Sequence, residues 1–136
     1  MKETPEQRSR IMRAVKGADT TPELAVRRLA HGMGYRFRLH RKDLPGKPDL
    51  TFPGLRKVIF VHGCFWHGHD CARGARVPVQ NRDYWMRKVA RNMERDRSVR
   101  SALQGLGWRS LVVWECEIKD LDRLRRELRR FLGRAA

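Results

Sequence analysis

A dense run of side chains that can bind metal ions or transfer protons lies near the middle of the chain, from Val61 to Cys71. It reads VHGCFWHGHDC and contains three of the five histidines and two of the three cysteines of the 136-residue sequence. Two adjacent aromatic residues, Phe65 and Trp66, interrupt the run, and the hydrophobic residues 58–60 precede it. This is not the composition of a protein core, so the run predicts metal binding, acid–base chemistry or both.

Three cysteines and one histidine can together close a tetrahedral zinc site: Cys64, His69, Cys71 and Cys116. The first three belong to the run, and the fourth follows a hydrophobic stretch at 109–114. Four protein ligands leave no open position for a substrate, so such a zinc would be structural. Asp70 or His67 could replace one of these ligands, and the alternative without a metal is three buried thiols beside an incidental histidine.

The zinc assignment leaves His62 and His67 for other chemistry. Asp49 follows the turn LPGKP and supplies a hard oxygen ligand of the kind that Mg2+ prefers. If the strand that Asp49 begins pairs with a strand at 57–62, its carboxylate meets the end of that second strand. Together with Asp96, an acid facing inward from a later helix, these side chains could hydrolyse a phosphodiester. The alternative for Asp49 is a turn residue at a strand start.

Hydrophobic periodicity predicts the elements that position these side chains. A first helix is expected with Thr21 as its cap and Pro22 at its first position, running to about residue 31 before glycines at 32 and 34. Further helices are expected at 83–103 and 121–132, strands at 35–39 and 49–52, and buried strands at 57–62 and 109–114. A helix between the last two strands implies a parallel pair. The fold class is therefore α/β, with a central mixed sheet flanked by helices.

Three polar side chains fall on helix faces that should pack against the sheet. Glu23 shares a face with Val26, Ala30 and Met33. Asn92 and Asp96 lie within the apolar stripe of their helix. Burying any of them without a partner would cost about 1 to 3 kcal/mol, so each should meet a hydrogen-bond donor, a cation or a metal-bound water. A structural hydrogen bond at the edge of the core is the alternative for each.

The charge of the chain points to a polyanionic partner. It carries 31 Lys and Arg against 15 Asp and Glu, a net charge of +16, while 40% of its residues are hydrophobic. This describes a folded basic protein, and counterion release favours nucleic acid over the competing membrane surface. No long apolar segment occurs, so we expect no membrane partner, a cytoplasmic location and reduced thiols. We expect residues 1–19 to form a basic segment that contacts DNA and residues 20–136 to form a single domain.

Five motifs follow one another between residues 8 and 117: RSRIMRAVK, LPGKPDL, VIFVHGCFWHGHDC, YWMRKVARNMERD and LGWRSLVVWEC. In this combination they resemble the very short patch repair (Vsr) endonucleases, bacterial enzymes that nick DNA at T:G mismatches left when 5-methylcytosine deaminates. The resemblance implies a compact relative of the restriction-endonuclease core, Mg2+-dependent and strand-specific hydrolysis, and a structural zinc. We further expect a monomer with a functional link to a cytosine-5 DNA methyltransferase.

The resemblance also implies roles for individual residues. Asp49 resembles the metal-binding acid, and Val61 stands where a backbone carbonyl helps to hold Mg2+. His67 resembles the histidine that positions or deprotonates the attacking water, while His62, steadied by Asp96, resembles the group beside the scissile phosphate. Glu23 would orient metal-bound water. The expected structural zinc ligands are Cys64, His69, Cys71 and Cys116, and the expected aromatic wedge between bases is Phe65, Trp66 and Trp85.

The chain departs from the family pattern in two respects. Gly68 and Asp70 stand where some relatives have histidines, although no expected ligand is lost. The acid-x-lysine motif of restriction-type nucleases is not visible at 57–62, which fits a site that relies on one acid and histidines. Two other functions stay open: a non-catalytic, zinc-containing protein that binds mismatched or distorted DNA, and a restriction-type endonuclease. For Trp85, a place in the core is the alternative to the wedge.

Overall fold

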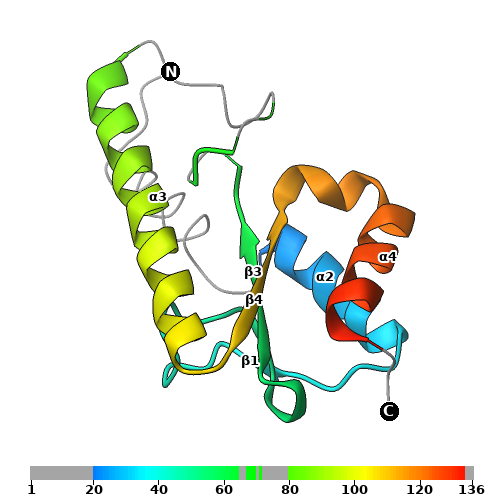
Figure 1. Ribbon diagram of the computed structural model, residues 1–136. Coiled ribbons are helices and arrows are strands. Elements are labelled where there is room, and N and C mark those ends of the chain that lie inside the picture. The colour runs from blue at the N-terminus through cyan, green and yellow to red at the C-terminus, as the bar shows by residue number, and fades with distance from the viewer. Residues whose placement is uncertain (1–19, 65–66, 70, 72–79, 134–136) are drawn as a thin grey trace, which may run out of the picture.

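The computed structural model describes residues 20–64, 67–69, 71 and 80–133. Four strands form one sheet, which lies between two helical layers (Figure 1). The strands are β1 (Arg38–Leu39), β2 (Leu50–Phe52), β3 (Lys57–His62) and β4 (Arg109–Trp114). The helices are α2 (Thr21–Gly32), α3 (Arg82–Gly105) and α4 (Leu121–Leu132), with short 3-10 helices η1 (Pro53–Leu55) and η2 (Glu115–Lys119). Residues 1–19, Phe65, Trp66 and Asp70 lie outside the described residues.

The sheet is mixed, as expected, and its strands follow the order β1-β2-β3-β4. The β1–β2 and β2–β3 pairs are antiparallel, whereas β3 and β4 are parallel and α3 connects them. Leu50 lies opposite Ile59, and His62 lies opposite Trp114 at the far end of the parallel pair. This register places the residue before β2 and the ends of β3 and β4 along one edge of the sheet, the edge that is formed by strand ends and not by an outer strand.

Alternation along the strands divides the core between the two faces of the sheet. The face covered by α2 and α4 holds the larger cluster, which includes Leu50, Phe52, Ile59 and Val113 from the sheet. The face covered by α3 holds Val58 and Phe60 with Leu103 and the partly buried Val99. Val61 packs with the first cluster, whereas the next residue, His62, approaches Phe60 on the opposite face. Val61 and His62, which are consecutive at the end of β3, therefore lie on opposite faces of the sheet.

Three details differ from the sequence-based expectations. The cap of α2 is Thr20, whose hydroxyl accepts a hydrogen bond from the Glu23 N–H at 3.4 Å, so the expected cap Thr21 is wrong by one residue. The expected strand at 35–39 shrinks to its last two residues, because Tyr35 turns into the core and its hydroxyl donates to the Gly133 carbonyl. The strand at 109–114 was expected to be buried, but β4 is the last strand in the sheet order and only Val113 within it is fully covered.

The two acids expected to face inward do so. Glu23 is 2% exposed and lies beside the fully buried Val26 and Ala30. Asp96 and Asn92 are half-buried within the expected stripe of α3. In the part of the chain that the structure describes, no helix is long and apolar enough to cross a membrane.

Candidate active site and metal centres

Asp49 and the end of β3 meet at the edge of the sheet, as the strand pairing predicted. The Asp49 carboxylate, just before β2, accepts a hydrogen bond from the Val61 N–H at 2.7 Å. The N–H and C=O of one strand residue point to the same side, so the Val61 carbonyl faces the same side as the Asp49 carboxylate. Continuing the β2–β3 register places Pro48 opposite Val61, and proline has no N–H to donate to that carbonyl. The pair therefore presents two oxygen ligands at one edge.

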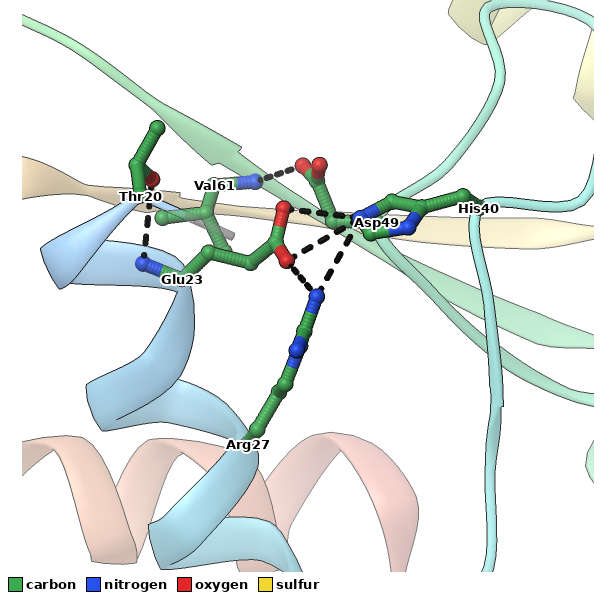
Figure 2. A network of polar contacts seen from close by, with 6 residues as sticks. All are labelled: Thr20, Glu23, Arg27, His40, Asp49 and Val61. Atoms are coloured by element: carbon green, nitrogen blue, oxygen red, sulfur yellow. Dashed lines mark hydrogen bonds and ion pairs between the residues drawn. The ribbon is translucent and has the colours of Figure 1, made fainter. Parts of the chain in front are cut away.

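Glu23 reaches the same place from the first turn of α2 (Figure 2). Arg27, one helical turn later, forms an ion pair with its carboxylate, and His40 Nε2 lies 3.0 Å from both of its oxygens. Ligand atoms of Glu23, His40 and Asp49 all lie within 4.8 Å of one another. This arrangement could hold a cation between two carboxylates.

The two carboxyl groups of this cluster differ in acidity. Burial raises the pKa of Asp49 to about 7, and the neighbouring Glu23 carboxylate adds to the shift. Burial also opposes ionisation of Glu23, but its interactions with Asp49, His40 and Arg27 outweigh that effect and lower its pKa. Two carboxylates this close repel each other in their charged forms, and a cation bound between them removes that repulsion.

A second cluster lies on the α3 side of the sheet and contains His62, His67 and Asp96. The two imidazole rings stack with their centroids 3.7 Å apart and their planes at 7°. His67 Nδ1 is hydrogen-bonded to Asp96 Oδ2 at 2.6 Å, whereas His62 Nδ1 is 3.9 Å from the same oxygen. Asp96 was expected to steady His62, but its hydrogen bond goes to His67. Burial lowers the pKa of His62 to about 3, and the positive charges of His67 and Arg100 act in the same direction.

The third cluster brings together the four residues expected to bind zinc: Cys64, His69, Cys71 and Cys116. Cys116 Sγ and His69 Nδ1 are 3.5 Å apart. A sulfur at about 2.3 Å and a nitrogen at about 2.0 Å from one tetrahedral ion would be about 3.5 Å apart, so the spacing fits zinc. Burial raises the pKa of Cys64 to about 12, and the thiols of Cys71 and Cys116 contribute. Metal coordination would compensate for gathering three thiols in one place.

Trp114, at the end of β4, links the histidine cluster to the cysteine cluster. Its ring stacks on His69 with centroids 4.2 Å apart and meets His62 edge-on at 5.3 Å. Gly68, between His67 and His69, has a φ of +66°, and a Cβ there would lie 2.4 Å from Met93 Sδ on α3. Because the backbone passes so close to α3, a histidine at this position would require a different loop path.

Sequence reasoning missed three residues of these clusters. His40 and Arg27 contact Glu23, and Trp114 packs against His62 of the second cluster and His69 of the third. Arg27 carried a signal, because it lies one helical turn after the inward-facing Glu23. His40 carried none, since its role depends on a left-handed backbone conformation with a φ of 50°.

The three residues expected to form the wedge are only partly described. Phe65 and Trp66 lie outside the described residues. Trp85 is half-buried near the start of α3, where it contacts Tyr84 edge-on at 5.1 Å, and Lys88 approaches its ring. It belongs to neither core cluster of the described residues, and its place in the wedge stays a prediction. Asn92 accepts a hydrogen bond from Arg95 at 3.2 Å.

A basic α/β protein with paired carboxylates and stacked histidines along one sheet edge has the side chains of a phosphodiester-cleaving enzyme. A family model described as DNA mismatch endonuclease Vsr matches residues 2–73, more than half of the chain. The chain belongs to this family of DNA mismatch endonucleases, which confirms the resemblance seen in the sequence.

Individual relatives agree with this assignment. The chain is 53% identical to the Type II nicking enzyme V.XorIIP of Xanthomonas oryzae pv. oryzae, over 95% of this chain and 94% of that protein. It is 44% identical to the DNA mismatch endonuclease Vsr of Escherichia coli, over 86% of this chain and 74% of that protein. It is 38% identical to the Type II nicking enzyme V.NmeAIP of Neisseria meningitidis, over 93% and 94% of the two chains.

Proposed function

We propose that this chain is a Mg2+-dependent, strand-specific DNA endonuclease that nicks next to the thymine of a T:G mismatch, as in very short patch repair. The observation that carries the proposal is the meeting of Asp49 with the end of β3, beside Glu23 and one residue away from His62. The helix α3 between the parallel strands supports a compact restriction-endonuclease-like core around this edge.

The donor set at Asp49 fits Mg2+. Magnesium prefers hard oxygen ligands and keeps several waters, and Asp49, Glu23 and the Val61 carbonyl supply oxygens from three segments of the chain. When bound, the ion would neutralise charge on the phosphate and make a bound water more acidic. Glu23 is held in place by Arg27 and His40, which supports its role in orienting water beside Asp49.

The histidine pair would take part in proton transfer from the attacking water. A carboxylate only accepts hydrogen bonds, so Asp96 keeps the proton of His67 on Nδ1 and leaves Nε2 able to accept one from the attacking water. Because the two rings stack at 3.7 Å, a positive charge on one opposes a charge on the other. His62 would therefore stay neutral while His67 is charged, and it would act as a hydrogen-bond partner beside the scissile phosphate and the departing oxygen.

Mismatch selection would come from aromatic insertion. Separating stacked bases costs a few kcal/mol per step and least where pairing is already defective, so a wedge favours mismatches over matched duplex. Phe65, Trp66 and Trp85 are the proposed wedge, and the net charge of +16, including the basic segment 1–19, would bind the phosphates. The T:G substrate arises by methylation of cytosine and then deamination, so a cytosine-5 methyltransferase would supply it. We propose that the protein acts as a monomer, so that a single chain binds and nicks the DNA.

The cysteine cluster would hold a structural zinc rather than a catalytic one. Its four ligands fill a tetrahedral coordination shell and leave no position for water. The loop that supplies Cys64, His69 and Cys71 also carries His67, and the fourth ligand follows β4. The zinc would therefore fix the loop, and with it His67, against the end of the sheet.

A nicking assay on short duplexes tests the proposal. The chain should nick T:G duplex with Mg2+ and leave matched T:A duplex and EDTA-treated reactions uncut. Asp49→Ala should abolish nicking, whereas Asp43→Ala, which removes an exposed acid paired with Arg41 from the same inter-strand segment, should retain it. Equal cleavage of matched duplex, or full activity in Asp49→Ala, would contradict the proposal. Mismatch binding without any nicked product would instead favour a non-catalytic binding protein.

A further inference from the structure

His40 brings a nitrogen atom to a centre that the proposed function builds from oxygens alone. Its Nε2 lies 3.0 Å from Glu23 Oε1 and 3.0 Å from Glu23 Oε2. Figure 2 shows the imidazole reaching Glu23 beside Asp49, from the segment that follows β1. One ligand atom from each of Glu23, His40 and Asp49 lies within 4.8 Å of the other two. The imidazole therefore shares a cation-sized space with both carboxylates.

The backbone conformation and a backbone hydrogen bond of His40 determine where this ring lies. Its φ is 50°, in the left-handed region that side chains other than glycine rarely adopt, although histidine is among those that tolerate it. Its N–H donates to the Asp49 carbonyl at 3.3 Å, which ties the backbone of His40 to the residue that carries the central carboxylate. The ring and the Asp49 side chain therefore have a fixed relation.

The polar contacts of His40 are compatible with a hydrogen bond to Glu23 and also with a cation held between the two side chains. Arg27 Nη2 also lies 3.3 Å from Nε2, and a guanidinium can only donate. If Nε2 carries a proton, it and Arg27 both donate to the Glu23 carboxylate. If Nε2 carries none, it accepts from Arg27 but faces two carboxylate oxygens, which are also acceptors. In this second case, a divalent ion between Glu23 and the bare Nε2 would reconcile the carboxylate with the nitrogen.

The spacing also suits direct coordination. Adjacent ligands at about 2.1 Å from an octahedral ion are about 3.0 Å apart, and opposite ligands are about 4.2 Å apart. The Nε2–Glu23 separations of 3.0 Å equal the first value, and the 4.8 Å limit on the whole group leaves room for the second. His40 is thus at ligand distance and does not need to move far to bind an ion.

We propose that His40 Nε2 is a ligand of the divalent cation at the Asp49–Glu23 centre, and that the centre consequently binds Mn2+ more tightly than Mg2+. Imidazole nitrogen suits first-row transition ions, whereas Mg2+ prefers oxygen. The inference rests on the proposed function only in taking this centre as the site of the hydrolytic metal. It assigns that site a mixed oxygen and nitrogen donor set.

Binding of Mn2+ to the zinc-loaded full chain tests the inference without any cleavage. Free Mn2+ is followed by electron paramagnetic resonance, Mg2+ by competition, and bound imidazole by its nitrogen coupling in the pulsed spectrum. His40→Gln keeps an amide that can donate to Glu23 but removes the imidazole, and His31→Gln removes an exposed histidine on α2 as the matched control. We expect His40→Gln to weaken Mn2+ binding about tenfold or more, to affect Mg2+ less and to abolish the coupling.

Other outcomes would overturn the inference. An unchanged Mn2+ to Mg2+ ratio and a retained nitrogen coupling in His40→Gln would exclude His40 as a ligand. Loss of the coupling in His67→Gln alone would place the ion at the histidine pair instead. If His40→Gln does not fold, His40→Asn, which suits the left-handed backbone but is too short to coordinate, gives the same comparison. Mg2+-dependent nicking, together with a Mn2+ to Mg2+ affinity ratio that His40→Gln leaves unchanged, would reject His40 as a ligand while leaving the proposed function intact.

Discussion

Replacing Asp96 with asparagine isolates the contribution of one hydrogen bond to the proposed chemistry. Asp96 Oδ2 lies 2.6 Å from His67 Nδ1, and the carboxylate can only accept, so it fixes the proton on Nδ1. Asparagine has nearly the same shape but can present its amide N–H instead. Asp96→Asn should therefore release His67 into a mixture of tautomers, of which only one leaves Nε2 able to accept a proton.

The size of the effect follows from the kind of bond that is lost. A hydrogen bond to a charged group contributes about 1.5 to 3 kcal/mol, and about 1.4 kcal/mol corresponds to a tenfold change in rate. This gives a loss of about 10- to 150-fold. The side chains of His67 and Asp96 are 25% and 22% exposed, so solvent screens part of the interaction. We therefore expect the lower half of this range, about 10- to 40-fold.

Single-turnover nicking of a T:G duplex with enzyme in excess measures this loss. DNA binding, followed separately by fluorescence anisotropy in EDTA, should not change, because Asp96 acts through His67 and not on the phosphates. Glu94→Gln, which neutralises an exposed acid on the same helix, should behave as wild type. A nicking rate within about threefold of wild type, or an equal loss in Glu94→Gln, would refute the assignment of His67 and Asp96 as a functional pair.

Three further predictions concern stability and metal content. Purified protein should hold about one zinc per chain by elemental analysis, and Cys116→Ser should lower that content; carefully purified protein without zinc would contradict the structural site. Burial and the nearby Glu117 raise the pKa of Glu127 above 4.5, so folding loses stability as pH rises through 4.5 towards the raised value. Thermal unfolding of Glu127→Gln should match wild type near about pH 4 and exceed it at about pH 7; the same difference at both would count against this. Leu128→Ala should reduce the unfolding free energy in urea by about 2 to 5 kcal/mol, and the exposed Leu121→Ala by well under half of that.

The parts of the fold that local sequence determines were predicted well. The bounds of β3, β4 and α4 match the expectations residue for residue, because a continuous apolar run and a strict Arg and Leu periodicity mark them. Tyr35 shows where this fails: its hydroxyl binds the Gly133 carbonyl, 98 residues away, and that contact removes the residue from a strand. No pattern within residues 35–39 carries information about the C-terminal end of α4.

In the candidate site, too, the features set by residue type and strand order were predicted, and those set by distant contacts were not. The gathering of Cys64, His69, Cys71 and Cys116 was predicted, because residue type and strand order suffice for it. The choice of Asp96 for His67 rather than His62 was not, because the position of His67 depends on an irregular loop that bends at Gly68 against Met93. His40 lies six residues before the turn glycine of LPGKP and meets Glu23 only after α2 has packed onto the sheet.

The run from Val61 to Cys71 now separates into parts that can be perturbed independently. Val61 is a strand residue with its side chain in the α2 and α4 core, and its backbone holds Asp49. His62 points to the other face, and His67 is placed by the loop that carries the cysteines. Loss of the fourth cysteine should therefore displace His67 and slow nicking while leaving cation binding at Asp49 nearly unchanged, because that centre depends on the sheet and α2 rather than on the loop.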